Sequence, residues 1–316
     1  MMLARVADSL YWMGRYIERA EHVSRLSDVM LTASLDTSGD ALLAARTVLG
    51  AVGETQIALE GKSAVDVAAA LMLDRDDPGS VIVSLARARE NARQVRDQIT
   101  SETWERLNLL FLRITSPKAA KQFDQASLPF LHEVISDLFL FKGAVDTTMS
   151  HGEGWRFLML GIYLERAQLI VRLLDVCFGE AAGGEPLNDH LAQMNLLRMA
   201  CALEPYLRVY TADIQPKLIQ EFLLFSEEFP RSIQFATARI EEHLKALASP
   251  GLDQGSSAPE RLAGRLSARL RFADLEEMAS QGAGSLLATV NQDCARIHEA
   301  IYGAYVDYSL EHHLPG

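Results

Sequence analysis

Apolar positions recur at helical spacing along almost the whole chain. They follow intervals of three and four residues, and no stretch combines two-residue alternation with hairpin turns. The pattern predicts helices over 3–34, 40–60, 62–74, 80–98, 102–114, 117–150, 153–179, 187–210, 216–227, 231–248, 259–280 and 283–311. We therefore expect an all-α protein, a large helical bundle of about 10–12 helices.

Local signals refine some helix ends. The Ser-Pro pair at 116–117 is typical of an N-cap followed by a first-turn proline, and Ser257 with Glu260 fits a capping box. Pro129 and Pro205 lie inside two predicted helices. A proline inside a helix removes a hydrogen bond and clashes with the preceding turn, so we expect these two helices to be kinked or divided.

The chain repeats part of its own sequence. "GRYIERAEHVSRLSDV" (14–29) and "GIYLERAQLIVRLLDV" (161–176) are identical at nine of sixteen positions, with an offset of 147 residues. A second echo follows in the same order, "PGSVIVSLARARE" (78–90) against "PRSIQFATARIEE" (230–242), with an offset of 152. Two ordered echoes at nearly constant offset predict a tandem duplication.

The predicted copies are residues 1–150 and 151–316, and they would most simply pack about a pseudo-two-fold axis. This period is far longer than the roughly 20–50 residues of the short-repeat solenoids. The best candidate linkers are 179–186 and 249–259, and neither falls at the boundary between the copies. One fused helical body is therefore expected.

The returning segment, 153–178, carries apolar side chains in nearly every direction around a helical wheel, so the helix should be central. It also contains Glu165, Arg166, Arg172 and Asp175. Isolated ions are costly to bury, so these charges must be paired. Arg172 can meet Asp175 three residues on, but Glu165 needs a partner from another helix.

The first copy offers that partner. Glu21 can meet Arg25 one turn away within its own helix. Across the pseudo-axis, Glu18 and Arg25 could face Arg172 and Glu165 in a reciprocal network. Spacing alone suggests this hypothesis.

Two interpretations of the Glu/Arg residues stay open. They form either a structural ion-pair cluster that fixes the register of the central helices, or a polar cavity where arginines hold a carboxylate or phosphate and a glutamate handles protons. A ligand site would lean on the first copy, which has Tyr11, Trp12 and Arg15 where the second has Leu158, Met159 and Ile162. Trp12 also suits ordinary core packing.

A basic stripe follows the first echo. Arg89, Arg93 and Arg96 recur at helical spacing, with Glu90 and Asp97 between them. Such a stripe is usually a solvated, salt-bridged face. The alternative is a site for an anion or an acidic peptide.

Composition narrows the functional classes. The chain of 316 residues is 49% hydrophobic and carries a formal charge of −12, which disfavours nucleic acid and anionic membranes as partners. Three distant cysteines without a CxxC pair indicate a reducing compartment. With no secretory signal or apolar run of membrane-spanning length, we expect a cytoplasmic protein.

Motifs for common chemistries are absent. The sequence contains no HExxH, Glu-x-x-His, Walker A, GxGxxG or GxSxG. We therefore expect no metal and no cofactor. His22, beside Glu21, is expected to lie at the surface or at an interface.

The segment "RVADSLYWMGRYIERAEHVSRLSDV" and its repeat "GIYLERAQLIVRLLDV" resemble sequences of the Alpha-E family of bacterial all-helical proteins, which is named for a Glu-Arg motif. The segments "LARARENARQVRDQI", "WERLN" and "FPRSI" also resemble its internal blocks, so the likeness covers most of the chain. The family motif falls on Glu18-Arg19 and Glu165-Arg166. The second copy departs from the usual Gly-Arg by having Gly161-Ile162.

The resemblance implies a partner rather than a known activity. Similar proteins are encoded beside, or fused to, circularly permuted ATP-grasp proteins, transglutaminase-like proteins and Ntn-hydrolase-type peptidases. The expected function is a noncatalytic partner or peptide-binding component of an ATP-grasp-linked peptide synthesis or modification system. One alternative is an enzyme with Glu18 or Glu165 as acid or base, and another is a pure scaffold. The candidate binding residues are Tyr11, Arg15, Glu18, Arg19, Arg25, Glu165, Arg166, Arg172, Arg89 and Arg93.

Overall fold

The computed structural model describes residues 2–35, 41–53, 57, 59–179, 187, 189–248, 257–273 and 283–307. Within these ranges the secondary structure is helical and no strand occurs, so the all-α prediction is confirmed. The helices are α1 (Ala4–Leu35), α2 (Ala41–Val52), α3 (Ala64–Leu73), α4 (Val81–Gln94), α5 (Ser101–Thr115), α6 (Ala119–Gln125), α7 (Ser127–Thr148), α8 (Glu153–Phe178), α9 (His190–Met199), α10 (Leu203–Tyr210), α11 (Pro216–Phe225), α12 (Ile233–Leu247), α13 (Ala258–Phe272), α15 (Ala283–Ile301) and the π-helix η2 (Tyr302–Val306).

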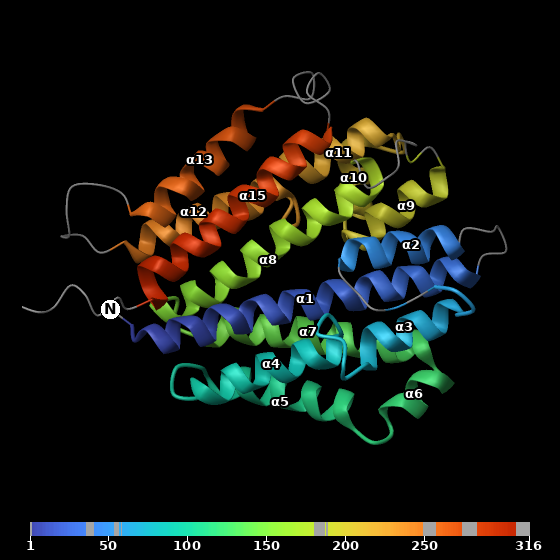
Figure 1. The fold of residues 1–316 in the computed structure, drawn as a ribbon, viewed down its shortest axis with the longest axis horizontal. Coiled ribbons are helices and arrows are strands. Elements are labelled where there is room, and N and C mark those ends of the chain that lie inside the picture. The colour runs from blue at the N-terminus through green and yellow to red at the C-terminus, as the bar shows by residue number, and fades with distance from the viewer. Residues whose placement is uncertain are drawn as a thin grey trace, which may run out of the picture.

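The two longest helices, α1 and α8, pack against each other in the middle of the molecule, and we call the place where their backbones come closest, at Gly14 and Gly161, the crossing. Figure 1 shows α4, α5 and α7 on one side of this crossing and α12, α13 and α15 on the other. Both central helices bury side chains around most of their circumference, which is the pattern expected of helices enclosed by others. The predicted central position of 153–178 is therefore confirmed.

Two glycines let the central helices approach closely. A Cβ on Gly14 of α1 would overlap the carbonyl oxygen of Leu158 on α8. Reciprocally, a Cβ on Gly161 of α8 would overlap the carbonyl oxygen of Tyr11 on α1. Any larger residue at either position would force the two backbones apart. These four residues are related in pairs by the 147-residue offset, although the duplication itself stays a prediction.

Prolines divide the chain where the sequence suggested. Pro129 and Pro205 each lie within the first turn of a helix, where no backbone N–H is required. The breaks fall just before them, at Ala126 and at 200–202. The predicted helix over 117–150 is therefore α6 and α7, and the one over 187–210 is α9 and α10.

Other helix ends were predicted less well. Ser116 closes α5, and its Oγ accepts from the Lys118 backbone N–H while α6 begins only at Ala119, so its expected role as an N-cap was wrong. Ser257 does cap α13, accepting from the Glu260 N–H.

The second helix is shorter than expected. It ends at Val52 rather than 60 because Gly53 adopts a φ of +96°, the left-handed conformation that terminates many helices. The candidate linkers 179–186 and 249–259 lie almost wholly outside the described residues.

Candidate functional site

Glu18 and Glu21 form the first ion-pair cluster at the crossing, which we call the Glu18 cluster. Arg166 of α8 donates to both oxygens of Glu18, with Nε–Oε1 at 2.7 Å and Nη2–Oε2 at 2.9 Å. Lys142 of α7 donates to Oε2 of both glutamates. Arg231, in the loop before α12, donates to Glu21 and lies 3.5 Å from Glu18 Oε1. Three separate elements thus bring cations to one turn of α1.

The Glu165 cluster lies on the other side of the crossing. Arg15 Nε of α1 donates to Glu165 Oε2 at 2.6 Å, and Arg19 Nε donates to Oε1 at 2.7 Å. Arg15 also donates through Nη2 to Gln168 Oε1 at 2.6 Å. Glu165 therefore receives its partners from another helix, as its spacing predicted.

The clusters pair the two halves reciprocally, but not through all the expected residues. Arg166 binds Glu18 and Arg19 binds Glu165, where Arg172 and Arg25 were predicted. Arg25 instead pairs with Glu21 at 2.9 Å, within α1.

The prediction for Arg172 was wrong. Its side chain is exposed at the edge of α8, with Nη1 3.5 Å from the carbonyl oxygen of Val52. It lies two turns beyond Glu165 along α8, past the segment where α1 and α8 approach most closely.

Both clusters are closed to solvent on their acidic side. Glu18 is 0% exposed and Glu165 is 2% exposed. Burial would raise the pKa of Glu18, but Arg166, Lys142 and Arg231 outweigh it and hold the pKa well below its usual value. Burial would also raise the pKa of Glu165, but the charges of Arg15 and Arg19 outweigh this effect and lower the pKa. Both carboxyl groups are therefore ionised at neutral pH.

The Glu21 carboxyl follows the same logic. Burial raises its pKa, and the charges of Arg231 and Lys142 reverse this and bring it to about 2. A buried acid with so low a pKa holds no proton to donate at neutral pH, and paired cations occupy its oxygens.

Tyr11 lies beside the Glu165 cluster, in contact with the C-terminal part of the described chain. Its hydroxyl is 2.8 Å from His298 Nδ1 of α15 and 3.5 Å from Arg15 Nη1. It is 1% exposed, and burial raises its pKa. A second chain of hydrogen bonds leads from Trp12 Nε1 to the Tyr302 hydroxyl of η2 and on to Asp8.

Sequence reasoning missed Lys142, Arg231, His298 and Tyr302. Two weak signals exist. Lys142 is the one basic residue in the apolar run over 134–145. Arg231 of the second half stands where the first half has Gly79, within the second repeated segment. No sequence signal of this kind marks His298 or Tyr302. Their contacts with α1 arise only because α15 and η2 pack against that helix.

Arg89 and Arg93 lie outside both clusters. Arg89 Nε donates to Asn108 Oδ1 at 2.8 Å, and its guanidinium lies 5.4 Å from the centre of the Trp104 ring. Arg93 is paired with Glu90 and its side chain is 62% exposed. These contacts lie within α4 and α5 and are those of a salt-bridged helix face.

His22 is buried, so the expected surface position was wrong. It is 1% exposed, and neither ring nitrogen has a hydrogen-bond partner among the described residues. Burial lowers its pKa to about 4, and the charge of Arg231 acts in the same direction. The ring is therefore neutral at pH 7.

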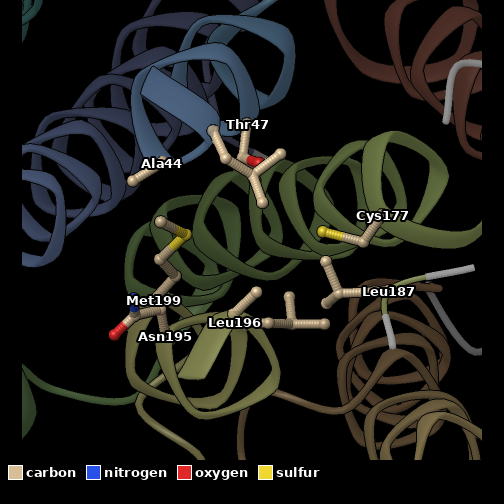
Figure 2. A pocket seen from close by; sticks show the side chains of 9 residues that line it. Ala44, Thr47, Cys177, Leu187, Asn195, Leu196 and Met199 are labelled. Atoms are coloured by element: carbon tan, nitrogen blue, oxygen red, sulfur yellow. The ribbon is translucent and has the colours of Figure 1, made fainter. Parts of the chain in front are cut away.

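A shallow apolar pocket lies where α2, α8 and α9 meet. Figure 2 shows the sulfur atoms of Cys177 and Met199 together with Leu187, Leu196 and Thr47 around it. No charged side chain lines it. Burial raises the pKa of the Cys177 thiol to about 12, so this thiol is un-ionised at neutral pH.

The described part of the chain offers no arrangement of three or more His, Cys, Asp or Glu side chains suited to a metal ion. Nor is any described helix long and apolar enough to cross a membrane.

Comparison with known proteins gives a family match. The Alpha-E sequence profile, described as "A predicted alpha-helical domain with a conserved ER motif", matches residues 2–306. Uncharacterised proteins from Mycobacterium bovis and from two strains of Mycobacterium tuberculosis are each 28% identical over 319 residues. The alignments cover 94% of this chain but 35% of each relative, so the chain spans roughly a third of their length. No solved structure matches significantly.

Proposed function

The chain belongs to the Alpha-E family, and from this membership we propose that it is a noncatalytic component of an ATP-grasp-linked peptide synthesis or modification system. It binds a circularly permuted ATP-grasp protein or a transglutaminase-like protein, or presents a peptide to that partner. The cations at the edges of the two ion-pair clusters are the binding groups. The buried glutamates hold those cations in position.

One observation carries this proposal: the carboxylates are enclosed, whereas several of their cations reach solvent. Glu18 and Glu165 side chains are 0% and 3% exposed, but Arg19 is 25% exposed. Lys142 and Arg25 are 19% and 18% exposed. A general acid or base must reach the substrate proton and needs a pKa near the working pH. The glutamates meet neither condition, while the edge cations can donate to an acidic group of a partner.

The length of the relatives also supports a partner role. In those proteins the matching region is about a third of the chain, so it works there as one part of a larger protein. A region that works as one part of a larger protein favours a role in an assembly of several components.

Co-expression with a circularly permuted ATP-grasp protein from the same organism tests the proposal. We expect a stable complex by size-exclusion chromatography with light scattering. Arg19→Gln should weaken it, because an edge cation is lost, whereas Arg269→Gln, an exposed arginine paired with Asp293, should not. If no complex forms with a circularly permuted ATP-grasp protein or a transglutaminase-like protein, the proposal fails.

The rival functions give different results. If Glu18→Gln abolishes turnover of a reconstituted ligase mixture while fold and partner binding persist, the protein is an enzyme. If the complex survives the loss of Arg19, Arg25 and Lys142 together, the protein is a scaffold that binds through another surface.

A further inference from the structure

A separate group of polar and aromatic side chains lies between α8 and α12. Trp155, Arg156 and Tyr163 come from α8, and Arg239 and His243 come from α12; we call this group the Trp155 cluster. The His243 ring lies 5.3 Å from the Trp155 ring, edge to face, and 5.8 Å from the Tyr163 ring, nearly parallel. Neither ion-pair cluster includes these residues.

The contacts of His243 fix its tautomer. Arg156 Nη1 lies 3.4 Å from His243 Nδ1, and a guanidinium can only donate hydrogen bonds. Nδ1 is therefore the acceptor, and the proton of the neutral ring is on Nε2. His243 is 3% exposed, and burial lowers its pKa to about 4, so the ring is neutral at pH 7.

Three N–H groups of the cluster have no acceptor. They are His243 Nε2, Trp155 Nε1 and Arg239 Nε, which are all buried and make no hydrogen bond to any residue that the structure describes. Buried polar groups in native proteins are nearly always paired. Each of these atoms is a donor, so what would satisfy them is an acceptor.

The charges near the cluster leave one cation unpaired. Arg239 forms an ion pair with Glu242 at 2.5 Å. His151, at the exposed rim, stacks on Trp155 and bonds to the carbonyl oxygen of Asp146. Arg156, by contrast, has no carboxylate within ion-pair distance in the described part of the chain, and Trp155 and Arg156 are both partly exposed. The cluster thus combines free donors, a free positive charge and access from solvent.

We infer that the Trp155 cluster binds an oxyanion, the carboxylate or phosphate group of a small ligand. Arg156 supplies the charge, and the N–H groups of Trp155 and His243 supply hydrogen bonds in a partly desolvated setting. The site belongs to the second half alone. At the matching positions of the first half, Asp8 stands in place of Trp155 at the offset of 147, and Asn91 stands in place of His243 at the offset of 152. This inference does not depend on the proposed function.

The indole signals of the intact protein provide the test. The chain has three tryptophans, so ¹⁵N-labelled protein gives three indole N–H signals, with that of Trp155 assigned through Trp155→Phe. Inorganic phosphate and N-acetylglycine are titrated separately, and N-acetylglycinamide serves as the uncharged control. We expect a saturable downfield shift of the Trp155 signal with at least one anion. The Trp12 indole, which already donates to Tyr302, should not move.

Substitution tests the charge. Arg156→Gln should weaken the binding of the anion by at least about tenfold, or about 1.4 kcal/mol. Arg208→Gln, which replaces an exposed arginine on α10, should leave the affinity unchanged. A response to phosphate alone or to N-acetylglycine alone identifies the source of the oxyanion. The inference is overturned if neither anion gives a saturable shift, if all three indoles shift together, or if folded Arg156→Gln binds as tightly as the unsubstituted protein. Should that variant not fold, the first two outcomes still decide.

Discussion

The two signature glutamates are held by different sets of donors. Glu18 accepts two parallel bonds from Arg166, and Lys142 adds a third. Glu165 accepts one bond from each of Arg15 and Arg19. Charge-assisted bonds of this kind, out of water, are stronger than neutral ones. Removing one partner is costly because a buried charge then remains without its counterion.

Glu165→Gln should therefore destabilise the protein. It leaves Arg15, whose side chain is 9% exposed, without its counterion, and the expected loss in free energy of unfolding is about 3–5 kcal/mol. Glu90→Gln is the matched control, since it breaks a solvent-exposed pair with Arg93 and should leave the free energy of unfolding nearly unchanged. Urea unfolding measures both, and equal losses would show that the buried pair has no special weight.

The buried His22 predicts how stability depends on pH. Its pKa falls from 6.5 to about 4 on folding. Between these values the unfolded chain takes up a proton that the folded chain refuses, so folding stability is complete above pH 6.5 and decreases as the pH falls toward 4. His22→Leu should flatten this decrease. Part of the decrease should remain in this variant, because burial also lowers the pKa of His243.

The measurement is the free energy of unfolding at several pH values across that window. His132→Leu serves as the control, because His132 is exposed and pairs with Asp28 at the surface. An unchanged slope in His22→Leu would mean that the ring is not held neutral in the folded protein.

At the level of elements, the crossing of α1 and α8 depends on backbone proximity. Gly14 and Gly161 place each helix against a carbonyl oxygen of the other, and the ion pairs lie one turn further along both helices. The glycines and the glutamates therefore depend on each other, because the arginine side chains of one helix can reach the glutamates of the other only if the two backbones are close.

Gly161→Ala should destabilise the protein, by about 1–3 kcal/mol or more, because the added methyl group overlaps backbone that cannot rotate away. Gly143→Ala on α7 is the control. Nothing lies within 4 Å of the methyl group there, and alanine favours helix, so stability should hold or rise. Thermal melting measures both. A neutral Gly161→Ala would show that the helices separate at little cost.

Sequence patterns predicted the elements better than their contacts. Helical spacing and the prolines at 129 and 205 located most helices, since these signals are local. Spacing also found the Glu21–Arg25 pair, because both residues lie on one helix. It could not find Lys142 or Arg231. Their approach depends on how α7 and the loop before α12 pack on α1, which no local pattern encodes.

For the whole molecule, the two halves share one core. Buried apolar residues from α1 to α15 form a single contiguous cluster, and Glu18 and Glu21 of the first half take Arg166 and Arg231 from the second. Neither half could keep these charges buried without the other. The two predicted copies, 1–150 and 151–316, should therefore fold as one unit.

This predicts a single unfolding transition. Trp12 reports on the first half and Trp155 on the second, and ¹⁹F-labelled tryptophan resolves their signals during urea unfolding. Both signals should change with the same midpoint, because a fully cooperative domain loses all its structure together. Two separated midpoints would show that the halves are independent domains.

The burial of the Glu18 and Glu165 clusters has a consequence for the environments that the fold tolerates. Dissolved ions screen the attraction between charges that face water, with a screening length of about 8 Å at a physiological ionic strength of about 0.15 M that shortens as salt is added, but they act much less on charges out of water. A rise in salinity would loosen surface pairs such as Arg93–Glu90 and leave the contacts between α1 and α8 nearly unchanged. The geometry at the centre of the protein is thus insulated from the salt content of its surroundings.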